Sequence, residues 1–269
     1  MGNYAVIGYP ISHSLSPLIH NANFEAKGTD DNYAALSVHP DYLQHIRDLV
    51  ASKELSGFNV TIPHKEAIIS YLDAVDTDAK MIGAVNTVSI DGDRLTGHNT
   101  DITGYMNAFL EVFGQAERRV LIIGAGGAAK AVHRAHANNG DDVTIAARRI
   151  EGFERFTEDD FKPMLIPDIT GTEQFDAIIN TTPVGMKGED LVKEMDIPES
   201  LISGNVIGVD LIYQPRKTKF LEYFADGKHM NGMPMLIHQA MDAYGIWTGE
   251  EGDYRAISKK YEEYIGGKS

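Results

Sequence analysis

Lys65 lies among polar residues whose types could bind and oxidise a polyhydroxylated acid. Asn59 and Thr61 precede it in the chain, and Asn86 and Asp101 follow. Most lysines are simply solvated, but a random surface lysine is not accompanied by such a cluster of polar residues. If Lys65 and Asp101 meet, the carboxylate can fix the ammonium group, which can then exchange a proton with a carbinol. The same pair would stabilise a developing alkoxide.

A glycine-rich loop further along the chain predicts a dinucleotide site. Gly124, Gly126 and Ala129 match the dinucleotide fingerprint in its alanine-ended form. The first glycine permits a tight turn, the second lets a pyrophosphate approach the backbone, and the alanine lets the helix pack on the strand. The helix start also offers unpaired N–H groups and a positive dipole to an anion. A lysine site followed by such a loop suggests hydride transfer.

The residues after the next expected strand favour NADP over NAD. An NAD site usually has an acidic residue about 20 positions after the loop to hold the ribose hydroxyls. This chain has Ala147-Arg148-Arg149 there, with Glu151 close by. Arginine suits a 2′-phosphate because its planar guanidinium donates two hydrogen bonds at once. The other interpretation is that both arginines are solvated surface charges.

Ser14 and Ser16 flank the expected start of the first helix. Ser16 before Pro17 is typical of a helix N-cap. A helix start with two hydroxyls can also receive a substrate carboxylate. The two interpretations are compatible, and this segment alone does not choose between them.

Composition excludes several classes of protein. The chain has 269 residues, 43% of them hydrophobic and 23% charged, with a net charge of −15 and no cysteine. That length suits two globular domains. The acidic balance argues against nucleic acid and anionic membranes as partners, and the absence of cysteine excludes disulfides and thiolate metal sites. His133 and His136 lack an evident third ligand, so no metal is expected. No signal peptide or long apolar stretch is found, so we expect a cytoplasmic protein.

Short apolar runs alternate with helical patterns along the chain. Strands are expected at 4–7, 33–38, 58–62, 85–90, 94–96, 119–123, 143–146, 177–180 and 206–211. Helices are expected at 16–27, 41–52, 102–113, 128–139, 235–247 and 254–264. The first half is α/β, and the second half predicts a doubly wound parallel sheet. The acidic run 158–160 is interpreted as a solvated face.

Several ordered motifs together resemble the shikimate dehydrogenase family over essentially the whole chain. They are Gly8-x-Pro10-x-x-His13-Ser14-x-Ser16-Pro17, Asn59-Val60-Thr61-x-Pro63-x-Lys65, Gly83-Ala84-Val85-Asn86-Thr87, Gly97-x-Asn99-Thr100-Asp101-x-x-Gly104, the Gly124 loop, Asn180-Thr181-Thr182-Pro183-x-Gly185-Met186, Asp210-x-x-Tyr213-x-Pro215 and Asn231-Gly232-x-x-Met235-x-x-x-Gln239. An ordered set of this size is far more specific than any single motif.

The resemblance implies a role for each matching residue. Ser14 and Ser16 would hold the carboxylate of shikimate, and Lys65 would be the catalytic acid–base residue. The hydroxyls of shikimate would be bound by Thr61, Asn86 and Asp101, and the pocket completed by Asn59, Tyr213 and Gln239. NADP would be bound by Gly124, Ala125, Gly126, Gly127 and Ala128 at the pyrophosphate, by Arg148 and Arg149 at the adenosine phosphate, and by Leu211 and Gly232 near the nicotinamide.

The resemblance also implies the domain organisation. Residues 1–103 and 237–269 would form a discontinuous α/β substrate domain, and residues 104–236 a Rossmann-like NADP domain, with a cleft between them. The expected reaction is the reversible reduction of 3-dehydroshikimate to shikimate, within chorismate and aromatic amino-acid biosynthesis. A monomer or homodimer is expected.

One departure and three alternatives stand beside this interpretation. The family commonly has Asn-Arg-Thr or Asn-Arg-Ser where this chain has Ala147-Arg148-Arg149, so the strength of the NADP preference is open. A quinate or dual-substrate dehydrogenase is the nearest alternative, and a nucleotide-sensing or scaffold protein without turnover is another. A folate-type dehydrogenase is disfavoured by Ser14, Ser16 and Gln239, which suit a small acid.

Overall fold

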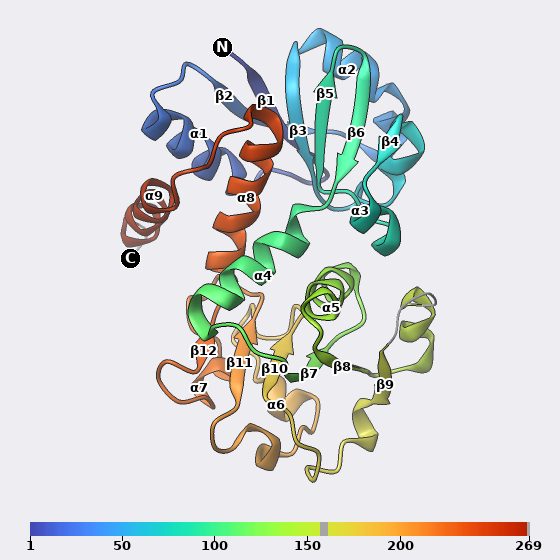
Figure 1. Ribbon diagram of the computed structural model, residues 1–269, viewed down its shortest axis with the longest axis vertical. Coiled ribbons are helices and arrows are strands. Elements are labelled where there is room, and N and C mark those ends of the chain that lie inside the picture. Colours follow the sequence, from blue (N-terminus) through green and yellow to red (C-terminus); the bar gives the residue numbers. More distant parts are fainter. Residues whose placement is uncertain (157–160, 268–269) are drawn as a thin grey trace. The chain divides into compact units, whose positions relative to one another are not determined.

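The computed structural model describes residues 1–156 and 161–267 (Figure 1). The acidic run 158–160 lies outside the described residues. The chain divides into two compact units, one formed by Met1–Gly104 with Ile237–Ser269 and the other by Tyr105–Leu236. The C-terminal helices thus belong to the same unit as the N-terminal sheet.

The first unit is built on a mixed sheet. Its strands are β1 (Asn3–Gly8), β2 (Asn32–Ser37), β3 (Leu55–Val60), β4 (Ala74–Val75), β5 (Thr87–Asp91) and β6 (Arg94–His98), in the order β2-β1-β3-β5-β6-β4. The strand β1 pairs in parallel with β2 and β3, whereas β5 runs antiparallel to β3 and β6. The predicted hairpin of β5 and β6 is confirmed, and Gly92 adopts the left-handed conformation in its turn. The two-residue strand β4 was not predicted.

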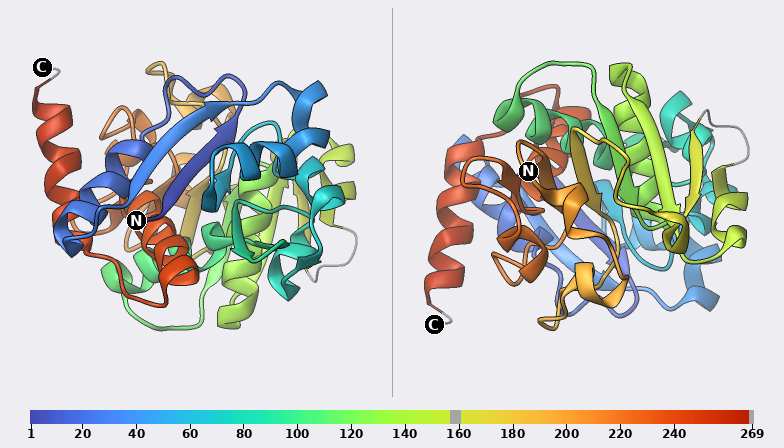
Figure 2. Two further views of the ribbon diagram at one scale, coloured as in Figure 1. Left: turned by 90° about the horizontal axis from the view of Figure 1, so that it is seen from above. Right: turned by 90° about the horizontal axis from the view of Figure 1, so that it is seen from below.

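Helices of the first unit are α1 (Ser16–Lys27), α2 (Ile46–Ser52), α3 (Thr77–Ile82), the start of α4 (Thr100–Phe113), most of α8 (Met233–Thr248) and α9 (Tyr254–Gly266), with 3₁₀ turns at Pro40–His45 and Ala67–Tyr71. The helix predicted at 41–52 is therefore a 3₁₀ turn followed by a short α-helix. The helix α9 lies alongside α1 (Figure 2), where the Asp253 amide donates to the Asn23 side chain at 2.7 Å. This contact ties the end of the chain to its beginning.

The prediction that Ser16 caps α1 is wrong. Ser16 is the first helical residue, and the preceding cap position is Leu15, whose side chain makes no capping hydrogen bond. The Ser14 hydroxyl accepts from the Ser16 amide at 3.3 Å instead. Since Pro17 already suits the first turn, the helix can start without a hydroxyl at the cap position. Gly28 ends α1 in the left-handed conformation, as predicted.

Two apolar clusters hold the first unit together. One is mostly aliphatic and includes Ile7, Phe58 and Val88 from the centre of the sheet. The other is aromatic and joins Tyr4 and Tyr33 of the sheet to helices α1 and α8.

A parallel sheet forms the second unit, which confirms the predicted doubly wound fold. Its strands are β7 (Arg119–Ile123), β8 (Asp142–Ala147), β9 (Lys162–Leu165), β10 (Ala177–Asn180), β11 (Ile207–Asp210) and β12 (His229–Met230), in the order β12-β11-β10-β7-β8-β9. Every strand pair described in this sheet is parallel. Besides the rest of α4 and the start of α8, its helices are α5 (Gly127–Asn139), α6 (Leu191–Glu194) and α7 (Lys219–Glu222), with 3₁₀ turns at Ile150–Phe156, Ile166–Asp168 and Glu199–Ile202.

The strand order of this sheet reverses between β7 and β10. The chain runs from β7 outward through β8 and β9, then returns to the other side of β7 with β10 and continues to β11 and β12. In open parallel sheets, ligands bind outside the carboxyl ends of the strands at such a reversal. The glycine loop follows β7 at this edge. Among the described residues, no helix is long and apolar enough to cross a membrane.

Candidate functional site

Lys65 and Asp101 form an ion pair within the first unit. The Lys65 Nζ lies 2.6 Å from the Asp101 Oδ2, and the two side chains are 30% and 19% exposed. Lys65 follows β3 by a short connection, and Asp101 lies in the first turn of α4. The pair is therefore tightly hydrogen-bonded yet still reachable from solvent.

The backbone of Lys65 is anchored by its neighbours. The buried His64 ring contacts the Val38 carbonyl through Nε2 at 2.7 Å, and the His64 amide donates to the Thr61 carbonyl at 2.9 Å. The Lys65 carbonyl accepts from the Val85 amide at 2.8 Å. These bonds fix the backbone position of Lys65. Only its long side chain then has to be oriented.

Asp101 is held by hydrogen bonds around the start of α4. Its amide donates to the Asn99 Oδ1 at 3.1 Å, and the Asn99 side chain in turn donates to the Ala84 carbonyl at 2.9 Å. The preceding amide, that of Thr100, donates to the Asn86 Oδ1 at 2.8 Å. A carboxylate in the first turn is also stabilised by the helix dipole.

Asn59 and Asn86 belong to a buried polar network that reaches Thr100, the residue before Asp101. The Asn59 Nδ2 donates to the Asn86 carbonyl at 3.1 Å and to the Thr87 Oγ1 at 2.9 Å, and its Oδ1 accepts from the Tyr33 hydroxyl at 2.5 Å. The Asn86 Nδ2 donates to the Thr100 Oγ1 at 3.1 Å. Both asparagines are buried, and Asn59 uses its amide chiefly to hold the network.

Tyr33 and His20 extend this network, and the sequence pattern did not single them out. Their rings stack 4.2 Å apart at an interplanar angle of 4°. Burial lowers the pKa of His20 to about 3, and the Asn59 side chain opposes the shift. Burial likewise raises the pKa of Tyr33 well above its usual value, and the Ser16 side chain opposes that rise. Both side chains are therefore uncharged at neutral pH.

The remaining predicted substrate residues of this unit lie at the start of α1, after β3 and on α8. Ser14 and Ser16 are half-buried at the start of α1, and Thr61 is half-buried after β3. Gln239 lies on α8 where it crosses α4, because a Cβ on Gly104 would come within 2.5 Å of the Gln239 amide nitrogen. Gly104 is three residues after Asp101, so it lies on the same face of α4.

The glycine loop in the second unit has room for a ligand. Gly124 is in the left-handed region at φ +113°, and a Cβ there would lie 2.6 Å from the Thr181 hydroxyl, so this position requires glycine for packing. A Cβ at Gly126 or Gly127 would meet no protein atom within 4 Å. Ala129 is fully buried against the sheet. No side chain caps the start of α5 at Gly126. An uncapped helix start with open space in front of it fits a pyrophosphate.

The other predicted cofactor residues surround the same sheet edge. Arg148 and Arg149 are exposed directly after β8. Leu211 follows β11, and a Cβ on Gly232 would collide with its carbonyl oxygen. Tyr213, predicted to bind substrate, belongs to this second unit and is half-buried.

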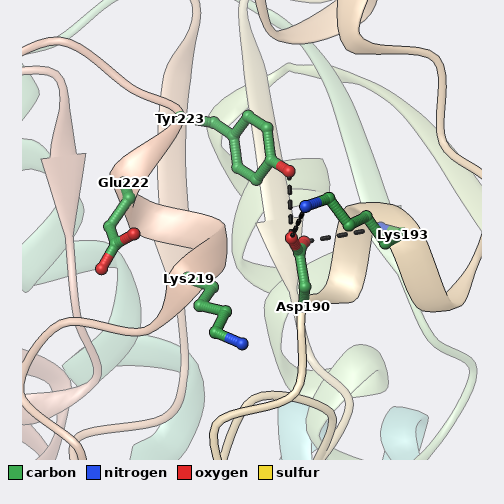
Figure 3. Close-up of a pocket in the computed structure, with 5 residues that line it drawn as sticks. All are labelled: Asp190, Lys193, Lys219, Glu222 and Tyr223. Atoms are coloured by element: carbon green, nitrogen blue, oxygen red, sulfur yellow. Dashed lines mark hydrogen bonds and ion pairs between the residues drawn. The ribbon is translucent and has the colours of Figure 1, made fainter.

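A polar pocket elsewhere in the second unit contains no predicted residue. Figure 3 shows the side chains that line it, which are Asp190, Lys193, Lys219, Glu222 and Tyr223. The pocket has a volume of about 350 Å³. The Tyr223 hydroxyl donates to the Asp190 Oδ2 at 3.0 Å, and the Lys193 Nζ lies 3.5 Å from the same oxygen. Asp190 also caps α6 through its other oxygen. These contacts show that the Asp190 carboxylate serves as a structural helix cap.

No group of three or more metal-binding side chains occurs in the part of the chain that the structure describes. His136 is buried between the Tyr105 hydroxyl, 2.8 Å from Nε2, and the Asp141 carboxylate, 2.5 Å from Nδ1. Both ring nitrogens are thus engaged in packing α4 and β8 against α5.

Comparison with known proteins identifies the family. Residues 6–88 match the model of the shikimate dehydrogenase substrate binding domain. The NADP⁺ shikimate dehydrogenase of Staphylococcus aureus (strain MSSA476) is 39% identical, covering 98% of this chain and 99% of that protein. A shikimate dehydrogenase solved with NADP⁺ is 34% identical, covering 98% and 96% of the two chains at a TM-score of 0.88. The Thermus thermophilus enzyme, solved with NADP(H) and shikimate, is 32% identical, covering 98% and 99% at a TM-score of 0.84. The chain belongs to the shikimate dehydrogenase family.

Proposed function

We propose that this protein is an NADP-dependent shikimate dehydrogenase that interconverts 3-dehydroshikimate and shikimate. The observation that carries the proposal is the 2.6 Å pair of Lys65 and Asp101, anchored by a buried network of amides and hydroxyls. The reaction would serve chorismate and aromatic amino-acid biosynthesis, in line with the family.

Lys65 is the group that moves the proton. Its ammonium donates a hydrogen bond to the ketone oxygen of 3-dehydroshikimate and supplies the proton as that carbonyl is reduced to the hydroxyl, and the resulting amine takes the proton back in the reverse direction. Asp101 holds the ammonium in place at 2.6 Å and keeps a negative charge beside it. A lysine with this partner also stabilises the partial negative charge that develops on the substrate oxygen.

The first unit binds the rest of the acid. Ser14 and Ser16 hold the carboxylate at the start of α1, and Thr61 binds a ring hydroxyl. Asn86, which has a second amide hydrogen besides the one donated to Thr100, can reach another. Asn59 supports Asn86 by donating to its carbonyl oxygen. Gln239 contributes to the substrate pocket from α8.

Cofactor binding belongs to the second unit. The loop from Gly124 to Ala128 receives the pyrophosphate at the open start of α5. Arg148 and Arg149 contact the adenosine 2′-phosphate from the end of β8, and Leu211 and Gly232 lie at the nicotinamide. Tyr213 is the substrate-binding residue proposed on this unit. When bound, NADP would supply or accept the hydride.

Initial-rate kinetics test the proposal. The purified protein is assayed with shikimate and with quinate, each with NADP⁺ and with NAD⁺, by absorbance of the reduced cofactor. We expect kcat/KM to be highest for shikimate with NADP⁺. Equal values for both acids would instead make it a dual-substrate dehydrogenase, and no turnover with any pair would favour a binding protein that keeps the fold. Equal values for both cofactors would show that Arg148 and Arg149 do not select the phosphate.

A further inference from the structure

Asn180 and Asp210 are buried polar residues at the carboxyl ends of the neighbouring strands β10 and β11. They are paired in the register of these parallel strands, and both are 0% exposed. A buried carboxylate is costly unless hydrogen bonds satisfy it. The pair lies at the edge of the sheet on which the cofactor is proposed to bind.

Three donors surround the Asp210 carboxylate. Its Oδ1 accepts from the Asn180 Nδ2 and from the Ile212 amide, each at 3.0 Å. Its Oδ2 accepts from the Thr218 hydroxyl at 2.6 Å. Burial raises the pKa of Asp210 to about 6, and these hydrogen bonds oppose the rise. At neutral pH the ionised carboxylate therefore closes the loop 211–217 by binding both its start and the residue that follows it.

Asn180 organises the other loop at this edge. Its Oδ1 accepts from the Thr182 amide at 2.9 Å and from the Thr182 hydroxyl at 2.7 Å, and its Nδ2 also donates to the Val184 carbonyl at 3.1 Å. The adjacent Thr181 donates its hydroxyl to the Ile123 carbonyl at 2.8 Å and lies against Gly124. The loop after β10 is therefore fixed to Asp210 on one side and to the glycine loop on the other.

Backbone hydrogen bonds in the loop after β11 continue this set of contacts to Leu211 and Gly232. The Leu211 amide donates to the Asn180 carbonyl at 3.0 Å, and the Gly232 amide donates to the Ile212 carbonyl at 3.2 Å. The backbone of Gly232 packs so closely on the Leu211 carbonyl that no side chain would fit between them. A continuous set of contacts thus links the pyrophosphate end of the proposed cofactor site to its nicotinamide end.

We propose that Asn180, Asp210 and Thr218 are positioning residues that hold the nicotinamide half of the cofactor site in register with the glycine loop. The proposal rests on the proposed function, because it takes Leu211 and Gly232 as the nicotinamide end. None of the three side chains needs to touch the cofactor. They act through the backbone of the two loops that they connect.

A matched pair of variants at Thr218 tests the proposal. Thr218 precedes α7 but makes no side-chain capping bond there, so its hydroxyl serves Asp210. Thr218→Val keeps nearly the same shape and removes the donor, whereas Thr218→Ser keeps the donor. Asp210→Asn is the second variant. It keeps an acceptor for Asn180 and Ile212 but has to reverse the hydrogen bond to Thr218.

Calorimetric binding of two ligands separates positioning from general stability. NADPH carries the whole cofactor, and adenosine 2′,5′-bisphosphate carries the adenosine phosphates without a nicotinamide. We expect Thr218→Val to weaken NADPH binding about tenfold or more. Binding of the bisphosphate should change less than about twofold, and Thr218→Ser should bind both ligands as the wild type does. If Thr218→Val does not fold, Asp210→Asn is measured with the same two ligands, and the same pattern is expected.

The outcomes are distinct. Equal weakening of both ligands, or no weakening of either, would overturn the positioning role while leaving the proposed function intact. A wild-type protein that binds neither ligand would overturn the proposed function, and this inference with it. A loss confined to NADPH and restored by serine would support the positioning role, since a purely structural role would not distinguish the two ligands.

Discussion

The Lys65–Asp101 pair combines a short charged hydrogen bond with partial exposure. Both side chains keep some contact with water, so neither charge carries the full cost of burial. A partly solvated ion pair of this kind contributes little to stability. We infer that the main role of Asp101 in this pair is to orient the ammonium group of Lys65.

Replacement of Asp101 tests this aiming role. Asp101→Asn keeps the shape of the side chain but removes the charge that holds the ammonium of Lys65. We expect kcat/KM for shikimate to fall by about 10- to 100-fold, the value of a charge-assisted hydrogen bond. The thermal midpoint should change little. Initial-rate kinetics measure this loss, with the exposed Asp30→Asn as the control, and unchanged constants in Asp101→Asn would refute the role.

The sequence identifies the polar residues of the candidate site better than it identifies the residues that contact and support them. Lys65, Asp101 and Asn86 could be selected because several polar types gather in short ordered motifs. Tyr33 and His20 could not, because their contacts with Asn59 and with each other join different strands and a helix. The support that Thr87 and Thr100 give to the asparagines depends likewise on how β3, β5 and α4 meet.

The start of α5 is the element that most directly tests cofactor binding. Gly126 has an extended backbone that any residue can adopt, and a Cβ there meets nothing in the protein. Gly126→Ala should therefore leave the thermal midpoint nearly unchanged. Its methyl group would occupy space needed by a pyrophosphate, so we expect Kd for NADP⁺ to rise by about tenfold or more.

Two measurements complete this test. Calorimetry gives Kd, and a thermal melt gives the stability. Gly124→Ala provides the contrast, because its strained backbone and its contact with Thr181 should lower the thermal midpoint as well. Unaltered NADP⁺ binding by Gly126→Ala would rule out a pyrophosphate at this position.

Long periodic elements were predictable and short ones were not. The strand Arg119–Ile123 and the ends of α1 and α5 at glycines agree with expectation, because apolar runs and left-handed glycines leave clear signals. Strands β4 and β12 have two residues each, too few for a period. The 3₁₀ turn before α2 keeps the same apolar spacing as a helix, so the pattern could not distinguish them.

At the scale of the whole molecule, the buried His20 predicts that acid destabilises the first unit. His20 has a pKa near 6.5 in the unfolded chain and about 3 in the folded protein. The unfolded chain therefore binds a proton that the folded protein excludes, and stability is lost as the pH falls from 6.5 toward 3. Between pH 7 and pH 5 this amounts to about 2 kcal/mol. Asp210 in the second unit acts in the opposite direction, because its pKa is raised to about 6.

Urea unfolding at pH 7 and pH 5 measures this loss. The chain has one tryptophan, Trp247, whose ring lies 5.4 Å from His20, so its fluorescence reports on the first unit. His20→Phe retains a ring to stack on Tyr33 but cannot be protonated. We expect the variant to lose about 2 kcal/mol less than the wild type over this pH range. An equal pH dependence in both proteins would exclude His20 as the cause.

The most direct test of the central claim is the turnover of Lys65→Ala with shikimate and NADP⁺. If Lys65 moves the proton during hydride transfer, kcat falls by roughly 10²–10⁴, while KM for shikimate stays similar. The exposed Lys80→Ala should keep wild-type kinetics and serves as the control. A Lys65→Ala variant with near-normal kcat would contradict the account.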